Sequence, residues 1–209
     1  MTNTIETEAR LMKSLYSSPY GMEYYIERKK LHKKGYEILN LVTVQGKRVL
    51  DVGAFAGFVG WLCKDRGAEV TLIDIFDNVF PTWMTGIVGD KDNMPFQDSS
   101  FDVVVCMDTL HHGDLVKGIR EIYRVLTPGG VFVSLEEPCI GTWENEAAVL
   151  AKDCSLELAN GICERRPNIV QYREALSIFP GYEILSGIDL SPARDLNYGG
   201  HGIVVKAYK

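Results

Sequence analysis

From residue 46 onward, short runs of apolar residues alternate with longer stretches that repeat apolar positions every three or four residues. Continuous apolar runs bounded by turn residues are typical of strands buried on both faces, and the longer stretches are typical of connecting helices. The pattern predicts an α/β fold with a parallel sheet and helices between its strands. The predicted strands are 49–52, 70–73, 86–88, 103–107 and 131–135.

Two further apolar runs close the chain, at 182–190 and 202–208, and a loop instead of a helix joins them. Strands joined in this way are expected to pair as an antiparallel hairpin at the end of the sheet. His201 lies in the glycine-rich joining segment, which favours a turn residue. A last helix is predicted over 168–179, ended by the Pro180-Gly181 pair.

A chain of 209 residues has the size of one α/β domain, so we expect a single domain over 1–209. Its first part, 1–45, has helical periodicity and is expected to form an N-terminal helical lid. The core of alternating strands and helices is expected over 46–142, a helical cap insertion over 143–166, and the last helix with the C-terminal hairpin over 167–209.

The charge balance limits the partners that this chain can have. Its 22 basic and 28 acidic residues give a net charge of −6, which disfavours nucleic acid as a partner. No apolar stretch reaches the roughly 18 residues of a membrane span, and the N-terminus lacks the features of a signal peptide, so a cytoplasmic protein is expected. The five cysteines form no CxxC pair and the four histidines no HExxH motif, so no metal site is predicted.

The first strand runs into a turn of small residues that opens a helix, Val49 to Gly57. Such a turn exposes backbone amides to a ligand. Asp74 ends the second strand, 23 positions after Asp51, where a carboxylate can accept from both hydroxyls of a ribose. A nucleoside site is therefore predicted. No Gly-Lys-Ser/Thr follows, which argues against a triphosphate, and the turn alone leaves a nucleotide-dependent oxidoreductase open as an alternative.

Further motifs follow the second strand in a fixed order: Gly89-Asp90, Asn93 to Phe96, Ser100 to Val105, Leu110-His111-His112 and Glu121 to Gly130. Together they closely resemble the class I S-adenosylmethionine-dependent methyltransferases, in the large branch that modifies small molecules. The resemblance covers residues 47–135, so the core over 46–142 is expected to bind the cofactor. It implies a Rossmann-like, seven-stranded, mostly parallel sheet with an antiparallel last strand and helices on both faces. It also implies S-adenosylmethionine as cofactor, S-adenosylhomocysteine as product and a small-molecule acceptor.

The resemblance assigns one set of residues to the methionine part of the cofactor. Gly53, Ala54 and Gly57 would surround it, with Asp51 near its amino group. Asp108, at the end of the fourth strand, would lie near the same ammonium. Acidic groups around this part of the site would favour a positively charged sulfonium ligand.

A second set would bind the nucleoside. Asp74 would bind the ribose, and Ile75 would pack on one face of the adenine ring. Asp90 would accept from the adenine amino group, while the amide of Lys91 would meet the ring.

Phe55 departs from the family pattern, because it stands at the position of the middle glycine in the family's GxGxG turn. A side chain there restricts φ and takes up space beside the methionine chain. One alternative is that the ring points away from the cofactor or closes over it. The second is that affinity for the cofactor is lost. In the second case the chain would be a non-catalytic or regulatory protein on a methyltransferase fold.

Three residues are candidates for catalysis: His111, His112 and Glu136. The histidines follow the fourth strand, at the edge where open α/β sheets bind ligands, and a histidine can remove a proton from a hydroxyl or an amine. Methyl transfer to an O or N nucleophile is therefore expected, with Glu136 orienting a histidine. Either histidine could instead pack or cap a helix, and the family pattern gives that structural role to His112. Aromatic residues that could line an acceptor pocket, or pack in the core, are Tyr16, Tyr20, Tyr24, Trp143 and Tyr172.

Overall fold

The computed structural model describes residues 38–55, 57–76, 80–81, 83–136, 167, 169–189 and 201–209. Most of the expected N-terminal lid and the whole expected cap over 143–166 lie outside these residues. The division of the chain into these parts stays a prediction.

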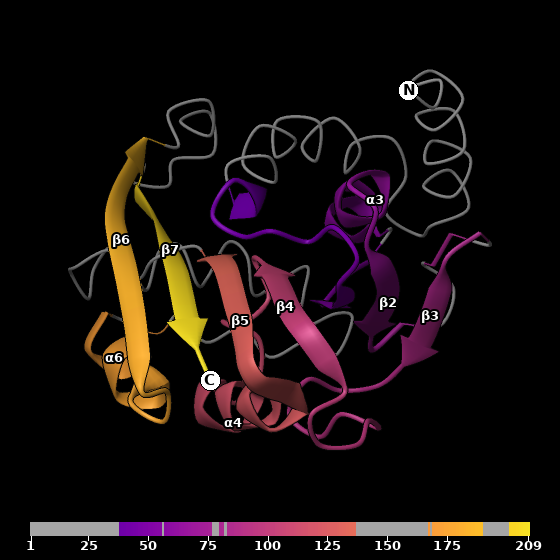
Figure 1. Ribbon diagram of the computed structural model, residues 1–209. Coiled ribbons are helices and arrows are strands. Elements are labelled where there is room, and N and C mark those ends of the chain that lie inside the picture. The colour runs from indigo at the N-terminus through magenta and orange to yellow at the C-terminus, as the bar shows by residue number, and fades with distance from the viewer. Residues whose placement is uncertain are drawn as a thin grey trace.

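The described core is one seven-stranded sheet with the strand order β3-β2-β1-β4-β5-β7-β6 (Figure 1). The strands β1 to β5 pair in parallel, and β7 runs antiparallel to both of its neighbours. This confirms the predicted fold class, including the C-terminal hairpin. The strands are β1 (Arg48–Val52), β2 (Glu69–Asp74), β3 (Thr85–Val88), β4 (Phe101–Met107), β5 (Leu126–Glu136), β6 (Gly181–Asp189) and β7 (His201–Tyr208).

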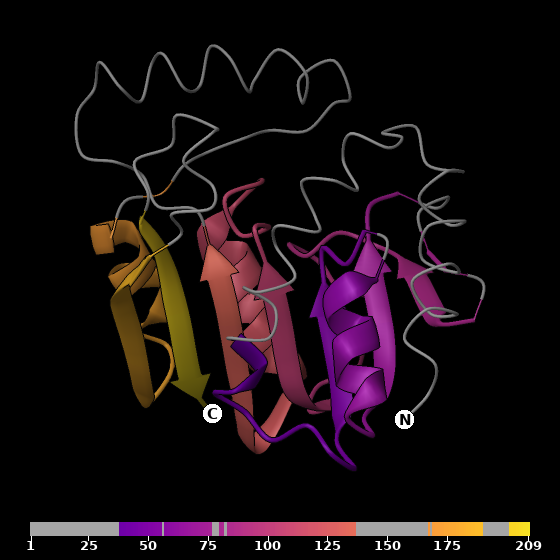
Figure 2. The same ribbon diagram turned by 90° about the horizontal axis from the view of Figure 1, so that it is seen from above.

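Helices cover both faces of the sheet (Figure 2). Helix α3 (Phe58–Asp65) packs on one face, and α4 (Leu115–Val125) and α6 (Ile169–Leu176) pack on the other. Helix α4 forms because its buried positions recur every three or four residues and because the Asp114 carboxylate accepts from two amides of its first turn, at 3.0 and 3.1 Å. Two separate apolar cores result, one on each face.

Two expectations about the connections are wrong. Residues 89–100, between β3 and β4, form turns and no helix. Asp90 accepts from the amide of Asp92 at 2.9 Å and from the amide of Asn93 at 3.0 Å, and such local bonds compete with helix formation. His201 is the first residue of β7, paired with Asp189, instead of a turn residue, because the β6–β7 ladder extends past a register shift.

The topology decides where a ligand can bind. Strand β1 lies between β2 and β4. The chain runs from β1 to β2 and β3 on one side and then crosses to β4 on the other side, so the order of the strands reverses at β1. Ligands of open α/β sheets bind at such a switch point, beyond the carboxyl ends of the strands. In this fold, β1, β2, β4 and β5 end there at Val52, Asp74, Met107 and Glu136.

Candidate active site at the carboxyl edge of the sheet

The turn after β1 has the backbone of a ligand-binding turn. Gly53 and Gly57 have φ values of 66° and 73°, in the left-handed region. A Cβ on Gly53 would lie 2.1 Å from Oγ1 of Thr109, so the turn needs glycine to approach the segment after β4. The amides of Gly53 and Ala54 donate to the carbonyl of Ile73 at 2.9 and 3.1 Å. The turn is thus held between the ends of β2 and β4.

Phe55 adopts the left-handed backbone that a glycine would supply, with φ 44°. Its side chain is buried and belongs to the apolar core between α3 and the sheet, together with Phe58 and Val59. The ring therefore packs into the protein, which matches the first alternative that the sequence left open, a ring that points away.

Asp51 is buried, and its Oδ2 accepts from the amide of Gly60 in α3 at 2.7 Å. A Cβ on Gly60 would lie 3.0 Å from that oxygen. This carboxylate ties β1 to α3, an anchoring contact that the sequence did not indicate.

The Asp74 carboxylate links the end of β2 to the turn after β1. Its Oδ2 accepts from the amide of Phe55 at 2.8 Å, and its Oδ1 accepts from the amide of Phe76 at 3.2 Å. Ile75, which follows, leaves 50% of its surface exposed. A carboxylate at the strand end beside an uncovered apolar side chain fits a ribose and the face of an adenine ring.

Asp90 and Lys91 lie in the turn after β3. Asp90 is exposed at the carboxyl edge, as a residue that recognises an adenine amino group would be. The Lys91 side chain is buried, and its Nζ pairs with Asp92 and contacts the carbonyl of Asp114 at 3.4 Å. The ammonium group thus points toward the start of α4, while the predicted role of Lys91 concerns its backbone amide.

Asp108 follows β4 with φ 50°, in the left-handed region. Its amide donates to the carbonyl of Leu135 at 2.8 Å, which continues the pairing of β4 with β5 beyond the last strand residue. Its side chain is half-buried at the edge where the resemblance expects the cofactor's ammonium.

The three catalytic candidates meet at this edge. The rings of His111 and His112 have centroids 4.1 Å apart, and Nδ1 of His111 lies 3.5 Å from Oε2 of Glu136. Glu136 is fully buried, and its Oε2 accepts from the amides of Thr109 and Leu110 at 3.2 and 3.0 Å. The buried member of the histidine pair is His111, 4% exposed, and His112 is half-buried. The structure therefore brings Glu136 to His111, the histidine that is left for catalysis if His112 has the structural role.

Burial also changes the pKa of a thiol next to Glu136, that of Cys106. Cys106 donates to Oε1 of Glu136 at 3.5 Å. Removal from water, and then the charge of Glu136, raise the pKa of this thiol well above its usual value, so it stays protonated.

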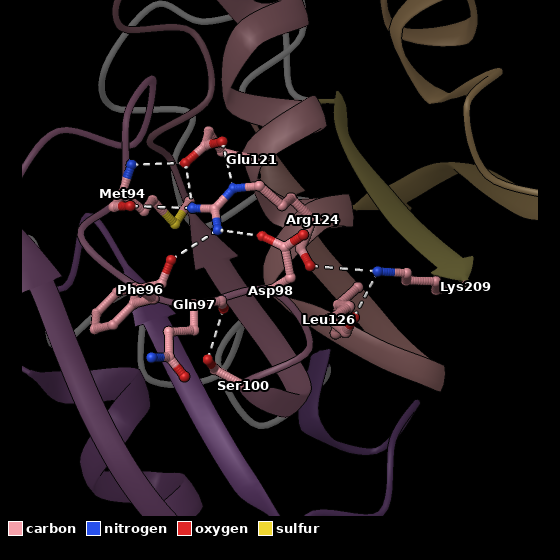
Figure 3. A network of polar contacts seen from close by, with 9 residues as sticks. All are labelled: Met94, Phe96, Gln97, Asp98, Ser100, Glu121, Arg124, Leu126 and Lys209. Carbon is pink, nitrogen blue, oxygen red and sulfur yellow. Dashed lines mark hydrogen bonds and ion pairs between the residues drawn. The ribbon is translucent and has the colours of Figure 1, made fainter.

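Sequence reasoning missed two contacts that fix the loop after β3. Arg124 and Glu121, at the end of α4, bind the backbone of Met94 and Phe96 (Figure 3). Asp92 accepts from the amide of Asp114 at the start of α4. The i, i+3 spacing of Glu121 and Arg124 was visible in the sequence, but their partners depend on the tertiary fold.

Among the described residues, no cluster of three or more metal-ligating side chains occurs, and no helix is long and apolar enough to cross a membrane. Tyr172 is fully buried in the core formed by α4, α6 and the sheet, so it packs in the core and does not line a pocket. The other aromatic candidates lie outside the described residues.

Known proteins similar to this chain are methyltransferases. Residues 50–134 match the family model described as "Methyltransferase domain". Over these residues, the chain matches the methyltransferases that its motifs resemble, the class I S-adenosylmethionine-dependent enzymes. This match supports the cofactor that the sequence predicted, S-adenosylmethionine.

Curated relatives and solved structures agree with this assignment. The chain is 35% identical to the sterol 24-C-methyltransferase erg6 of Aspergillus fumigatus over 179 residues, which is 83% of this chain and 46% of that protein. It spans less than half the length of the first curated relatives it matches.

Two solved structures share the fold. An S-adenosylmethionine-dependent methyltransferase from Mesorhizobium loti has a TM-score of 0.65 at 21% identity, covering 86% of this chain and 98% of that one. Phosphoethanolamine N-methyltransferase 2 of Haemonchus contortus, in complex with S-adenosyl-L-methionine, has a TM-score of 0.66 at 17% identity, covering 84% of this chain and 52% of that one.

Proposed function

We propose that the protein transfers a methyl group from S-adenosylmethionine to an oxygen or nitrogen nucleophile of a small-molecule acceptor. The observation that carries this proposal is His111, whose Nδ1 lies 3.5 Å from the fully buried carboxylate of Glu136 at the ligand-binding edge of the sheet. A base in such a position is useful only where a reaction releases a proton.

The residues around the turn after β1 fit the cofactor. Asp74 and Ile75 would hold the ribose and one face of the adenine, and Asp90 with the amide of Lys91 would hold the adenine edge. Gly53, Ala54 and Gly57 would surround the methionine part, with Asp51 behind the turn and Asp108 near the ammonium. When bound, S-adenosylmethionine supplies an electrophilic methyl group on a positively charged sulfur. The acidic groups at this edge favour a ligand of that charge.

The protein's own contribution to the reaction is alignment, exclusion of water and removal of a proton. With its Nδ1 proton facing Glu136, the neutral ring of His111 accepts a proton at Nε2. Glu136 then stabilises the positive imidazolium. Because the amides of Thr109 and Leu110 hold Glu136 in place, the carboxylate can fix the orientation of the ring.

The test needs an acceptor, found by screening metabolites for transfer of a labelled methyl group. With that acceptor, His111→Ala should lower turnover about 100-fold or more and remove the acid limb of the rate profile, because a general base is lost. The dissociation constant of S-adenosylhomocysteine should stay unchanged. His112→Ala is the matched control. Turnover of His111→Ala within about threefold of the parent, far below the general-base range, would refute the role of His111.

A second candidate acceptor is a carbon nucleophile, and the relative named a sterol 24-C-methyltransferase favours it. The π bond of an alkene attacks the methyl group without first losing a proton, so His111 would not be needed before methyl transfer. Analysis of the labelled product separates the two candidates, since it identifies the methylated atom. A protein that binds no cofactor in calorimetry would support the non-catalytic alternative.

A further inference from the structure

The loop between β3 and β4, residues 89–100, carries Asp90 but forms no helix or strand of its own. Side chains of α4 hold it instead. All three guanidinium nitrogens of Arg124 donate: Nε and Nη2 to the Glu121 carboxylate, Nη1 to the carbonyl of Phe96 at 2.7 Å, and Nη2 to the carbonyl of Met94 at 3.0 Å (Figure 3). Nη1 also reaches Asp98 at 2.8 Å.

Glu121 completes this contact. Its Oε2 accepts from the amide of Met94 at 2.8 Å, so both the N–H and the C=O of Met94 are bonded to side chains of α4. Hydrogen bonding by Arg124 lowers the pKa of Glu121, which keeps the carboxylate ionised at neutral pH. Glu121 and Arg124 thus supply the hydrogen bonds that a neighbouring strand would give to the backbone of Met94.

A second contact holds the beginning of the loop. Asp92 Oδ2 accepts from the amide of Asp114 at 2.9 Å, and Asp114 is the N-cap of α4. The buried Lys91 Nζ pairs with Asp92 beside it. A Cβ on Gly118 in α4 would lie 3.2 Å from this Nζ, so the helix leaves room for the pair. The loop therefore contacts α4 from the N-cap of the helix to its last turn.

We propose that Glu121 and Arg124 are positioning residues for cofactor binding, which hold the loop in the shape that presents Asp90 to the adenine. This inference rests on the proposed function, because it takes the adenine site at Asp90 as given. A loop without ladder bonds samples many shapes when its contacts are removed. The apparent dissociation constant then rises by the inverse of the fraction of molecules that keep the competent shape.

The direct test compares two exchanges between arginine and lysine. Arg124→Lys keeps the charge but cannot make the forked contacts. Arg48→Lys is the matched control, because Arg48 makes an equally forked pair with Asp102, a residue outside the loop that carries Asp90. By calorimetry, Arg124→Lys should weaken S-adenosylhomocysteine binding by about tenfold, as expected if one molecule in ten keeps the competent loop. The control should bind within about twofold of the parent.

A double-mutant cycle with Asp90→Ala distinguishes positioning from general destabilisation. If Arg124 acts through Asp90, Arg124→Lys should have little further effect on affinity once Asp90 is alanine. Hydrogen exchange of the cofactor-free protein gives a readout that needs no ligand, since the Met94 amide should exchange faster in Arg124→Lys. Glu121→Gln repeats all three measurements if Arg124→Lys does not fold.

The possible failures are distinct. A parent protein that binds no S-adenosylhomocysteine overturns the proposed cofactor site and this inference with it. A parent that binds, with variants that bind within about twofold although Met94 exchanges faster, overturns the inference alone. Additive effects of Arg124→Lys and Asp90→Ala overturn it as well, because they show that the two residues act independently.

Discussion

The strongest prediction concerns Asp74, because its carboxylate has two tasks. It accepts from the amides of Phe55 and Phe76, and in the proposed function it binds the ribose. Asp74→Ala removes both acceptors and leaves the amide of Phe55 without this partner in a buried place. Asp74→Asn keeps one side-chain oxygen, which can still accept from Phe55, but loses the charge.

Hydrogen bonds to a charged group contribute about 1.5–3 kcal/mol each. The loss of the Phe55 contact should therefore lower the free energy of unfolding of Asp74→Ala by about 2–3 kcal/mol, or roughly 5–10 °C in Tm for a chain of this size. Its affinity for S-adenosylhomocysteine should fall about 100-fold, since the ribose contact and the order of the turn are lost together. Asp74→Asn should lose only about tenfold in affinity and melt close to the parent.

The assay is thermal melting of the cofactor-free proteins, followed by calorimetry with S-adenosylhomocysteine. Glu174→Gln, at an exposed position of α6, is the control and should change neither quantity. A folded Asp74→Ala protein with the parent's affinity would remove the nucleoside site. An unchanged Tm together with a loss of affinity would show that the contact to Phe55 contributes little to stability.

Two further predictions follow from positive φ and from charge pairing. Phe55→Gly should stay folded and bind S-adenosylhomocysteine, while unfolding becomes easier by about 2–4 kcal/mol, because loss of a buried ring outweighs relief of the left-handed backbone; urea titration and calorimetry measure both effects. Hydrogen bonding by Arg48 lowers the pKa of Asp102 from 3.8 to about 2, so the pair stabilises the fold above about pH 4 and loses this effect as the pH falls through 2. Solvent screening weakens this half-exposed pair, and urea unfolding of Asp102→Asn at pH 3 and pH 7 should show a smaller pH dependence than the parent.

Much of the fold could be predicted because buried parallel strands are nearly continuous apolar runs. Each predicted strand overlaps an observed one, and the hairpin follows from two such runs joined without helical periodicity. The connection over 89–100 could not be predicted in this way. Its shape depends on contacts with α4, which follows in the chain, and periodicity within the segment carries no information about them.

The sequence predicted which site residues lie at the ends of strands. Asp74, Asp108 and Glu136 follow or end their strands at one edge, as the topology rule requires. The partners of these side chains were not predictable. The contact of Asp51 with α3 and the deeper burial of His111 than of His112 depend on how the elements pack, which the local sequence around each residue does not show.

Helix α4 joins the two halves of the proposed site physically. Its N-cap, Asp114, directly follows His112 and Gly113, and the amide of the same residue is bonded to Asp92 in the loop that carries Asp90. A shift of this loop relative to α4 must therefore break the Asp92 contact or move the start of the helix. Because the start of the helix is continuous with the segment that carries the histidines, the proposed adenine site and the candidate base share one support. In a reaction that depends on alignment of a nucleophile with a methyl group, such a common support keeps the two ends of the site in register.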